Sequence, residues 1–206
     1  MYPSAVTSAS SELRDVLLDR GAHEDAKPHR AGFRFKSYEA FVLAYGRGYV
    51  SAPLDRRERA HVQQMLRGHR TWWQRGFAYN LCFTNSQELM AFDATGKVIY
   101  VEGYVWAYGD RLPPVHHGWL SLHGKVLDVT AVTRTIAHPD KLPPEPPQLH
   151  GEFDGRAYFG VPFLRSHFSE RRKLNRGHGS LLNDEDAGYP MLAHGGEGAV
   201  RGLKRV

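Results

Sequence analysis

The hydrophobic and polar positions of the chain alternate most clearly in its middle third. Residues 98–107 are rich in β-branched and aromatic residues, a composition typical of strands. Alternation places Ile99, Val101, Gly103 and Val105 on one face and Val98, Tyr100, Glu102, Tyr104 and Trp106 on the other. Two more strands are predicted at 115–122 and 125–130, joined by His123-Gly124, a dipeptide typical of a two-residue hairpin turn. The pattern therefore predicts a small antiparallel sheet.

Helical segments are predicted ahead of this sheet. One spans 38–45 and ends before Gly46. A second spans 56–67, where Asp55 and Glu58 have the spacing of a capping box. A third covers about 81–92. Together with the strands, these helices predict an α+β fold in which N-terminal helices pack on a small antiparallel sheet.

A length of 206 residues fits one domain. We expect a flexible arm over residues 1–30, although 12–18 carries a short helical pattern with Leu13 and Leu17 on one face. A single α+β domain is expected over 31–169, and an irregular basic tail over 170–206. The proline-rich stretch at 135–147 predicts an extended connection on the surface.

Composition and sequence pattern indicate the cellular compartment expected for the protein. Hydrophobic residues make up 41% of the chain, yet no apolar run approaches the roughly 18 residues of a spanning helix. A single cysteine excludes an internal disulfide framework. The N-terminus lacks the pattern of a secretion signal. These features predict a cytoplasmic protein without a membrane partner, and its net charge of +5 permits acidic partners.

The hairpin brings two residues of catalytic type together. If His123-Gly124 forms the turn, Leu122 pairs with Lys125, and His117, Trp119 and Asp128 point to one face of the sheet. His117 and Asp128 are then diagonal neighbours on adjacent strands, within reach of each other's side chains. The carboxylate would fix the tautomer and orientation of the imidazole. A register slip of one residue would abolish this arrangement.

Cys82, the only thiol, lies close to a predicted helix start. With Asn80 as N-cap, Cys82 falls in the first turn, where the helix dipole favours a thiolate. A competing capping box formed by Thr84 and Gln87 would leave Cys82 just before the helix. In either case backbone N–H groups near the thiol can stabilise an oxyanion. We therefore expect a catalytic set of Cys82, His117 and Asp128.

Four further residues are candidates for substrate binding or support of the site. Asn85 lies one turn after Cys82 and either donates to a substrate carbonyl or ties the helix to a loop. Glu102 is either a buried polar anchor or a contact that supports the site. Tyr100 and Trp119 either wall a groove or belong to the aromatic core.

Binding by an inactive site and metal coordination are the alternatives to catalysis. The basic segment 56–67 and the tail residues Arg171, Arg172, Lys173 and Arg176 are compatible with binding of nucleic acid or an acidic protein by an inactive site, or with a solvated surface. No metal is expected, because His116 and His117 point to opposite faces of a strand, and no paired-cysteine or His-Glu-x-x-His motif is present. No other cofactor is expected.

The sequence also resembles a group of uncharacterised bacterial and phage proteins. The resemblance spans roughly 76–165 and is carried by Cys82-x-x-Asn85, 100–104, His117-Gly118-Trp119, 124–130 and 158–163. That group is similar in layout to the transglutaminase-like, papain-like superfamily. The resemblance implies a cysteine hydrolase or acyltransferase with Cys82 as nucleophile, His117 as base and Asp128 as orienter, acting on a peptide, amide or isopeptide. Gly118 and Val129 depart from the usual Ala and Pro.

Overall fold

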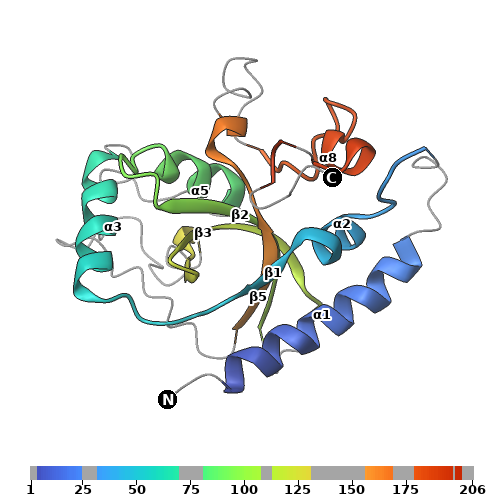
Figure 1. The fold of residues 1–206 in the computed structure, drawn as a ribbon, viewed down its shortest axis with the longest axis horizontal. Coiled ribbons are helices and arrows are strands. Elements are labelled where there is room, and N and C mark those ends of the chain that lie inside the picture. The colour runs from blue at the N-terminus through green and yellow to red at the C-terminus, as the bar shows by residue number, and fades with distance from the viewer. Residues whose placement is uncertain are drawn as a thin grey trace.

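A five-stranded antiparallel sheet forms the centre of the molecule (Figure 1). The structure is a computed structural model and describes residues 4–24, 32–69, 81–107, 113–130, 156–168, 179–196 and 198–200. The strands lie in the order β1-β5-β2-β3-β4. They comprise β1 (Arg47–Tyr49), β2 (Val98–Ala107), β3 (Val115–Leu122), β4 (Lys125–Leu127) and β5 (Arg156–Pro162). The predicted α+β class is confirmed.

The sheet curls until its two edge strands meet. Val50, directly after β1, donates its N–H to Gly124 O at 3.2 Å and accepts from Val126 N at 2.9 Å. Each of the five strands also contributes one residue to a second buried cluster, so this cluster fills the concave face of the sheet. Its members are Tyr49, Val101, Trp119, Val126 and Tyr158.

Two facing glycines allow this curvature. Gly103 of β2 pairs with Gly160 of β5. A Cβ on Gly103 would lie 2.3 Å from the carbonyl oxygen of Phe159, and a Cβ on Gly160 would lie 2.5 Å from Cη2 of Trp119. A side chain at either position would therefore push β5 away from β2 or from the indole.

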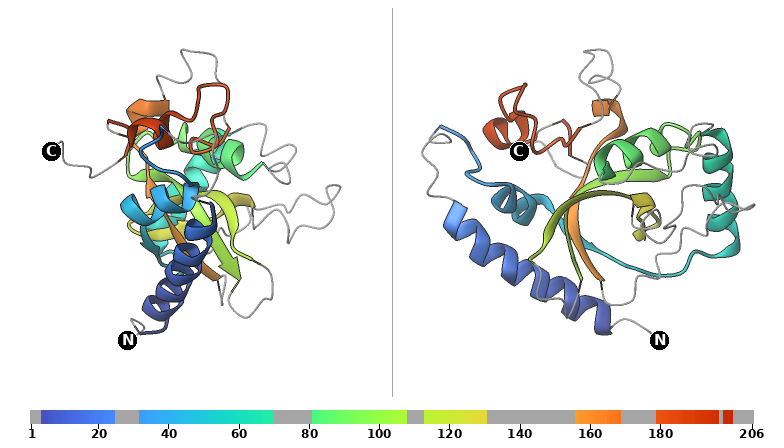
Figure 2. Two further views of the ribbon diagram at one scale, coloured as in Figure 1. Left: turned by 90° about the vertical axis from the view of Figure 1, so that its right-hand side faces the viewer. Right: turned by 180° about the vertical axis from the view of Figure 1, so that it is seen from behind.

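The larger core lies between the sheet and the helices. Helices α1 (Ser4–Glu24) and α2 (Tyr38–Tyr45) lie at one end of the sheet, and α3 (Arg56–Gly68) and α5 (Cys82–Met90) lie at the other (Figure 1, Figure 2). Ser37 caps α2, and the predicted capping box of Asp55 and Glu58 is present at α3. The two faces of β2 separate as predicted, because Tyr100 and Tyr104 join this core and Val101 joins the concave cluster.

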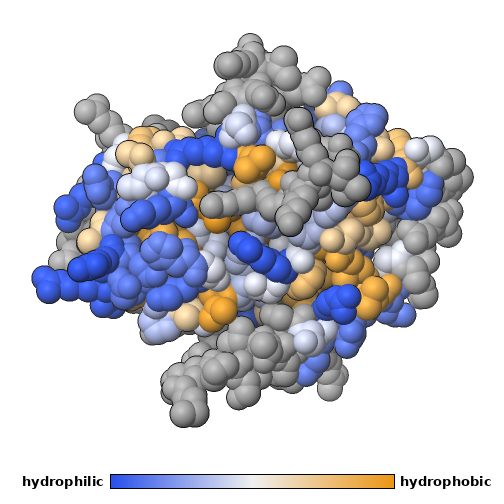
Figure 3. All heavy atoms as spheres, in the orientation of Figure 1, coloured by the Kyte–Doolittle hydropathy of each residue, from blue (hydrophilic) through white to orange (hydrophobic). Residues whose placement is uncertain are grey.

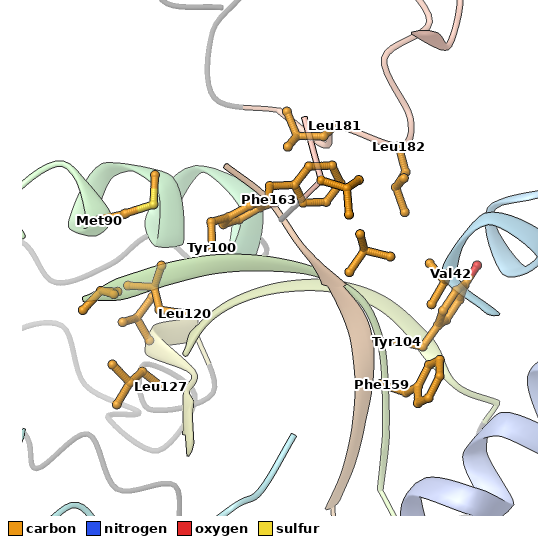
Figure 4. Close-up of a cluster of buried hydrophobic side chains, with 14 of the residues drawn as sticks. Val42, Met90, Tyr100, Tyr104, Leu120, Leu127, Phe159, Phe163, Leu181 and Leu182 are labelled. Atoms are coloured by element: carbon orange, nitrogen blue, oxygen red, sulfur yellow. The ribbon is translucent and has the colours of Figure 1, made fainter. Parts of the chain in front are cut away.

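Helices form within both of the terminal segments that were expected to lack regular structure. Instead of a flexible arm, most of the first thirty residues form α1, which buries Leu13 and Leu17 in the core. Part of the tail expected to be irregular forms α8 (Pro190–His194) and buries Leu181 and Leu182. Figure 4 shows Leu181 beside Phe163, which packs over the sheet. The C-terminal segment thus completes the core, a long-range role that local pattern does not reveal.

The β3–β4 hairpin has the predicted turn. His123 and Gly124 have φ values of 53° and 85°, as a turn with two left-handed central residues requires. Leu122 pairs with Lys125 and Leu120 with Leu127, which confirms the predicted register. However, β4 ends at Leu127 rather than continuing through 130. The Asp128 carboxylate accepts the N–H of Thr130 at 3.1 Å, which turns the backbone away from the sheet.

The surface is most hydrophilic at the end where α3 lies (Figure 3). Arg56, Arg57, Arg59 and Arg67 of this helix are exposed. Within the described ranges, no helix combines the length and the apolar character needed to cross a bilayer.

The glycine pair between β2 and β5 gives a direct test of the curl. We expect Gly103→Ala to lower the free energy of unfolding by about 2–4 kcal/mol, because the new methyl group meets backbone atoms that cannot turn away. Gly32→Ala is the matched control, since no atom lies within 4 Å of its Cβ position. Urea denaturation of both variants measures the difference. Equal stabilities would show that β5 does not approach β2 as described.

Candidate functional site

His117 and Asp128 form a partly buried hydrogen-bonded pair at the end of the β3–β4 hairpin. The His117 Nε2 atom lies 2.8 Å from Asp128 Oδ2, and the two side chains are only 12% and 2% exposed. A carboxylate accepts hydrogen bonds, so Nε2 carries the proton that it donates to Asp128. The diagonal contact predicted from the register is therefore present. It leaves Nδ1 as the ring nitrogen available to a second partner.

Cys82 lies beside this ring. It is the first residue of α5, and its side chain is close enough to His117 to contribute to the raised pKa of the imidazole. The thiol is buried and forms no disulfide. Leu81 occupies the N-cap position, so neither Asn80 nor Thr84 begins the helix. Since leucine has no hydrogen-bonding side chain, it offers no cap to the N–H groups of the first turn.

The short β4 strand allows α5 to reach His117. Because β4 ends at Leu127, the β3 backbone at Gly118 lies beyond the β3–β4 pairing, and its carbonyl accepts from Ser86 Oγ of α5 at 3.1 Å. A Cβ on Gly118 would lie 2.8 Å from Cδ1 and 3.2 Å from Cα of Phe83. Gly118 thus lets the first turn of α5 approach the strand.

A second connection links α5 to the acid. Asn85 is buried, and its Nδ2 donates to Thr130 Oγ1 at 3.2 Å. Thr130 in turn donates its backbone N–H to Asp128 Oδ1. Of the two roles considered for Asn85, the structure therefore shows the tie between helix and loop.

The electrostatics of the pair keep the ring protonated. Burial alone would lower the pKa of His117, but the Asp128 carboxylate and, to a smaller extent, the Cys82 side chain outweigh burial and raise this pKa to about 10. Trp119 stacks on the ring with centroids 6.3 Å apart and an interplanar angle of 16°. The imidazole is therefore held in one orientation and in its cationic form at neutral pH.

The other predicted supporting residues lie in the core and not along a groove. Trp119 and Tyr100 are completely buried. Tyr100 Oη donates to Glu102 Oε2 at 2.9 Å. The same hydroxyl lies next to β3 beneath α5, since a Cβ on Gly118 would be 2.9 Å from Tyr100 Oη. Of the two roles considered for these aromatic residues, their burial favours the core, where they support the elements that carry the site.

Glu102 is a buried anchor for the C-terminal segment. Its carboxylate accepts the N–H groups of Leu181 at 2.8 Å and Leu182 at 3.0 Å, as well as the hydroxyl of Ser180. Burial alone would raise the pKa of Glu102, but the nearby His116 and these donors hold it below its usual value. Gln87 of α5 also donates to Gly179 O at 2.8 Å. The segment is thereby fastened to both β2 and α5.

Tyr158 is the site residue that the sequence analysis missed. Its hydroxyl donates to Asp128 Oδ2 at 3.0 Å, the same oxygen that His117 contacts. Tyr158 comes from β5, which pairs with β2; the proline-rich stretch at 135–147, predicted to be an extended connection, precedes β5 and lies outside the described residues. Only the curl of the sheet brings β5 opposite Asp128, and no local pattern in the sequence indicates that pairing.

The alternative sites have less support. The exposed arginines of α3 are compatible with nucleic-acid binding, which stays a prediction, and residues 171–176 lie outside the described ranges. Among the described side chains, no three His, Cys, Asp or Glu residues are grouped closely enough to hold a metal ion.

Comparison with known proteins finds no matching family, no similar curated protein and no similar solved structure. The transglutaminase-like resemblance therefore stays a prediction from the sequence.

Protonation of His117 should make stability depend on pH through Asp128. Below pH 6.5 the ring is protonated in both the folded and the unfolded chain, so the contribution of the pair is complete. Between pH 6.5 and about 10 the unfolded chain loses this proton first, and the contribution fades. We expect the difference in free energy of unfolding between the wild type and Asp128→Asn to shrink by on the order of 3 kcal/mol across this range. A difference that stays constant in urea titrations at each pH would contradict the pairing.

Loss of the Glu102 anchor should destabilise the fold. In Glu102→Gln an amide N–H₂ replaces one acceptor oxygen and faces donors, so we expect a loss of about 2–4 kcal/mol in the free energy of unfolding. Glu88→Gln is the control, because its partly exposed carboxylate only contacts His69, and it should lose less than about 1 kcal/mol. Equal losses in thermal or urea unfolding would rule out the anchoring role.

Proposed function

We propose that the protein is a cysteine-dependent acyl hydrolase or acyltransferase with Cys82 as nucleophile, His117 as general acid and base, and Asp128 as the residue that orients the ring. One observation carries the proposal. The His117 ring is held by Asp128 through Nε2, while the thiol at the start of α5 lies against the same ring. This is the arrangement by which an imidazole activates a thiol.

Acylation begins with the Cys82 thiolate, which the adjacent imidazolium stabilises. The sulfur attacks the carbonyl carbon of an amide, ester or isopeptide, a C–S bond forms, and the π electrons of the carbonyl move to its oxygen. Backbone N–H groups in the first turn of α5 stabilise this oxyanion. When the intermediate collapses, the leaving amine or alcohol takes the proton from Nδ1 of His117, and a thioester on Cys82 remains.

Deacylation reverses these roles. Neutral His117 takes a proton from water or from an acceptor amine, whose oxygen or nitrogen attacks the thioester carbon. The C–S bond breaks and returns the Cys82 thiolate beside a protonated ring. Throughout both steps the Asp128 carboxylate stays ionised and compensates the imidazolium. The choice between water and an amine distinguishes a hydrolase from a transferase.

The reactivity of the single thiol tests this proposal without a known substrate. We expect His117→Ala to slow alkylation of Cys82 by iodoacetamide at pH 7 by about tenfold or more, because the cation that stabilises the thiolate is removed. Asp128→Asn should also slow it. The rates are followed by intact mass spectrometry, in which one adduct corresponds to the only cysteine.

His117→Ala also opens space beside the sulfur, and this change by itself would speed alkylation. A slower rate in the variant therefore reports the loss of the imidazole and not a change in access. The control is His194→Ala, at an exposed residue of α8, which should react at the wild-type rate. If the His117 variant reacts as fast as the wild type, the thiol and the imidazole do not act together and the proposal fails.

A further inference from the structure

Hydrogen bonds to Asp128 come from separate elements of the fold, and Tyr158 supplies one of them. Oδ2 accepts from His117 Nε2 at 2.8 Å and from Tyr158 Oη at 3.0 Å, whereas Oδ1 accepts from Thr130 N at 3.1 Å. The ring of Tyr158 is fully buried in the concave cluster, edge-on to Trp119 with centroids 5.3 Å apart. A phenylalanine ring would pack in the same cluster equally well. Packing therefore explains the ring of Tyr158 but not its hydroxyl.

We propose that Tyr158 is a positioning residue of the site, whose hydroxyl sets how tightly the His117–Asp128 pair holds its proton. The inference rests on the proposed function, in which His117 must release that proton to a leaving group. Tyr158 takes no part in the bond changes at the thiol. It acts through Asp128, to which it donates a hydrogen bond from β5, the strand that the curl of the sheet places opposite this carboxylate.

The direction of the effect follows from charge. While the ring is an imidazolium, its positive charge compensates the carboxylate. When the ring loses its proton, the buried carboxylate loses that compensation and depends more on its remaining donors. The Tyr158 hydroxyl therefore stabilises the deprotonated pair more than the protonated pair. Its presence makes the ring a better proton donor than Asp128 alone would allow.

A change of Tyr158 to phenylalanine isolates this hydroxyl. The carboxylate keeps the N–H of Thr130, so its orientation is preserved without Tyr158. Among the described residues, the titratable or charged groups near the pair and its cluster include Cys82 of α5, Arg156 of β5 beside the Tyr158 hydroxyl, and Tyr49 of β1, which accepts from Arg47 at 3.2 Å. The substitution leaves all of them in the chain.

The test is a titration of the His117 ring by ¹³C–¹⁵N NMR in the full-length protein. We expect Tyr158→Phe to raise the titration midpoint of His117 by about one pH unit. Tyr49→Phe is the matched control, because it removes from the same buried cluster a hydroxyl that accepts from Arg47, and it should leave the midpoint unchanged. A merely structural role would change the stability of both variants and leave both midpoints alone.

An unchanged or lowered midpoint in Tyr158→Phe would overturn the inference. Its failure is distinguishable from failure of the proposed function through the alkylation of Cys82. If His117→Ala slows alkylation but Tyr158→Phe does not move the midpoint, only the role of Tyr158 is lost. If His117→Ala has no effect on alkylation, the proposed function fails, and the role of Tyr158 in that reaction fails with it.

Discussion

The hydrogen bond between His117 and Asp128 is the interaction on which the candidate site depends. It forms because a two-residue turn at His123-Gly124 fixes the β3–β4 register, which places both side chains on one face of the sheet. Asp128 then ends β4 by binding the N–H of Thr130. The same residue therefore orients the imidazole and stops the strand, and the early stop leaves room for α5 to bring Cys82 to the ring.

Curvature of the sheet supplies the rest of the site. The edges of the sheet meet where Val50 binds the backbone of Gly124 and Val126, and the facing glycines of β2 and β5 allow the bend. One consequence is the contact of Tyr158 with Asp128 across the concave face. A second is that His117 is buried against Trp119, where the attraction of a carboxylate is strong enough to offset the loss of water around the ring.

The sequence predicted the parts of this arrangement that depend on local rules. Alternation along 98–107, the X-Gly turn and the capping box at Asp55 all operate within a few residues, and each is present in the structure. Tyr158 and the segment at 180–182 could not be predicted, because their contacts with Asp128 and Glu102 join residues 30 or more positions apart in the chain. Pairing at such distances is set by the packing of the whole core and leaves no periodic signal.

The proposed chemistry requires that the Cys82 sulfur and the His117 ring face each other in solution. The most direct measurement is cross-linking by 1,3-dibromoacetone, whose two reactive carbons are separated by one carbonyl carbon, with peptide mapping by mass spectrometry. Cys82 is the only cysteine, so the first alkylation has one defined site. We expect an intramolecular bridge from Cys82 to His117. A stable single adduct on Cys82, or a bridge to a different residue, would contradict it.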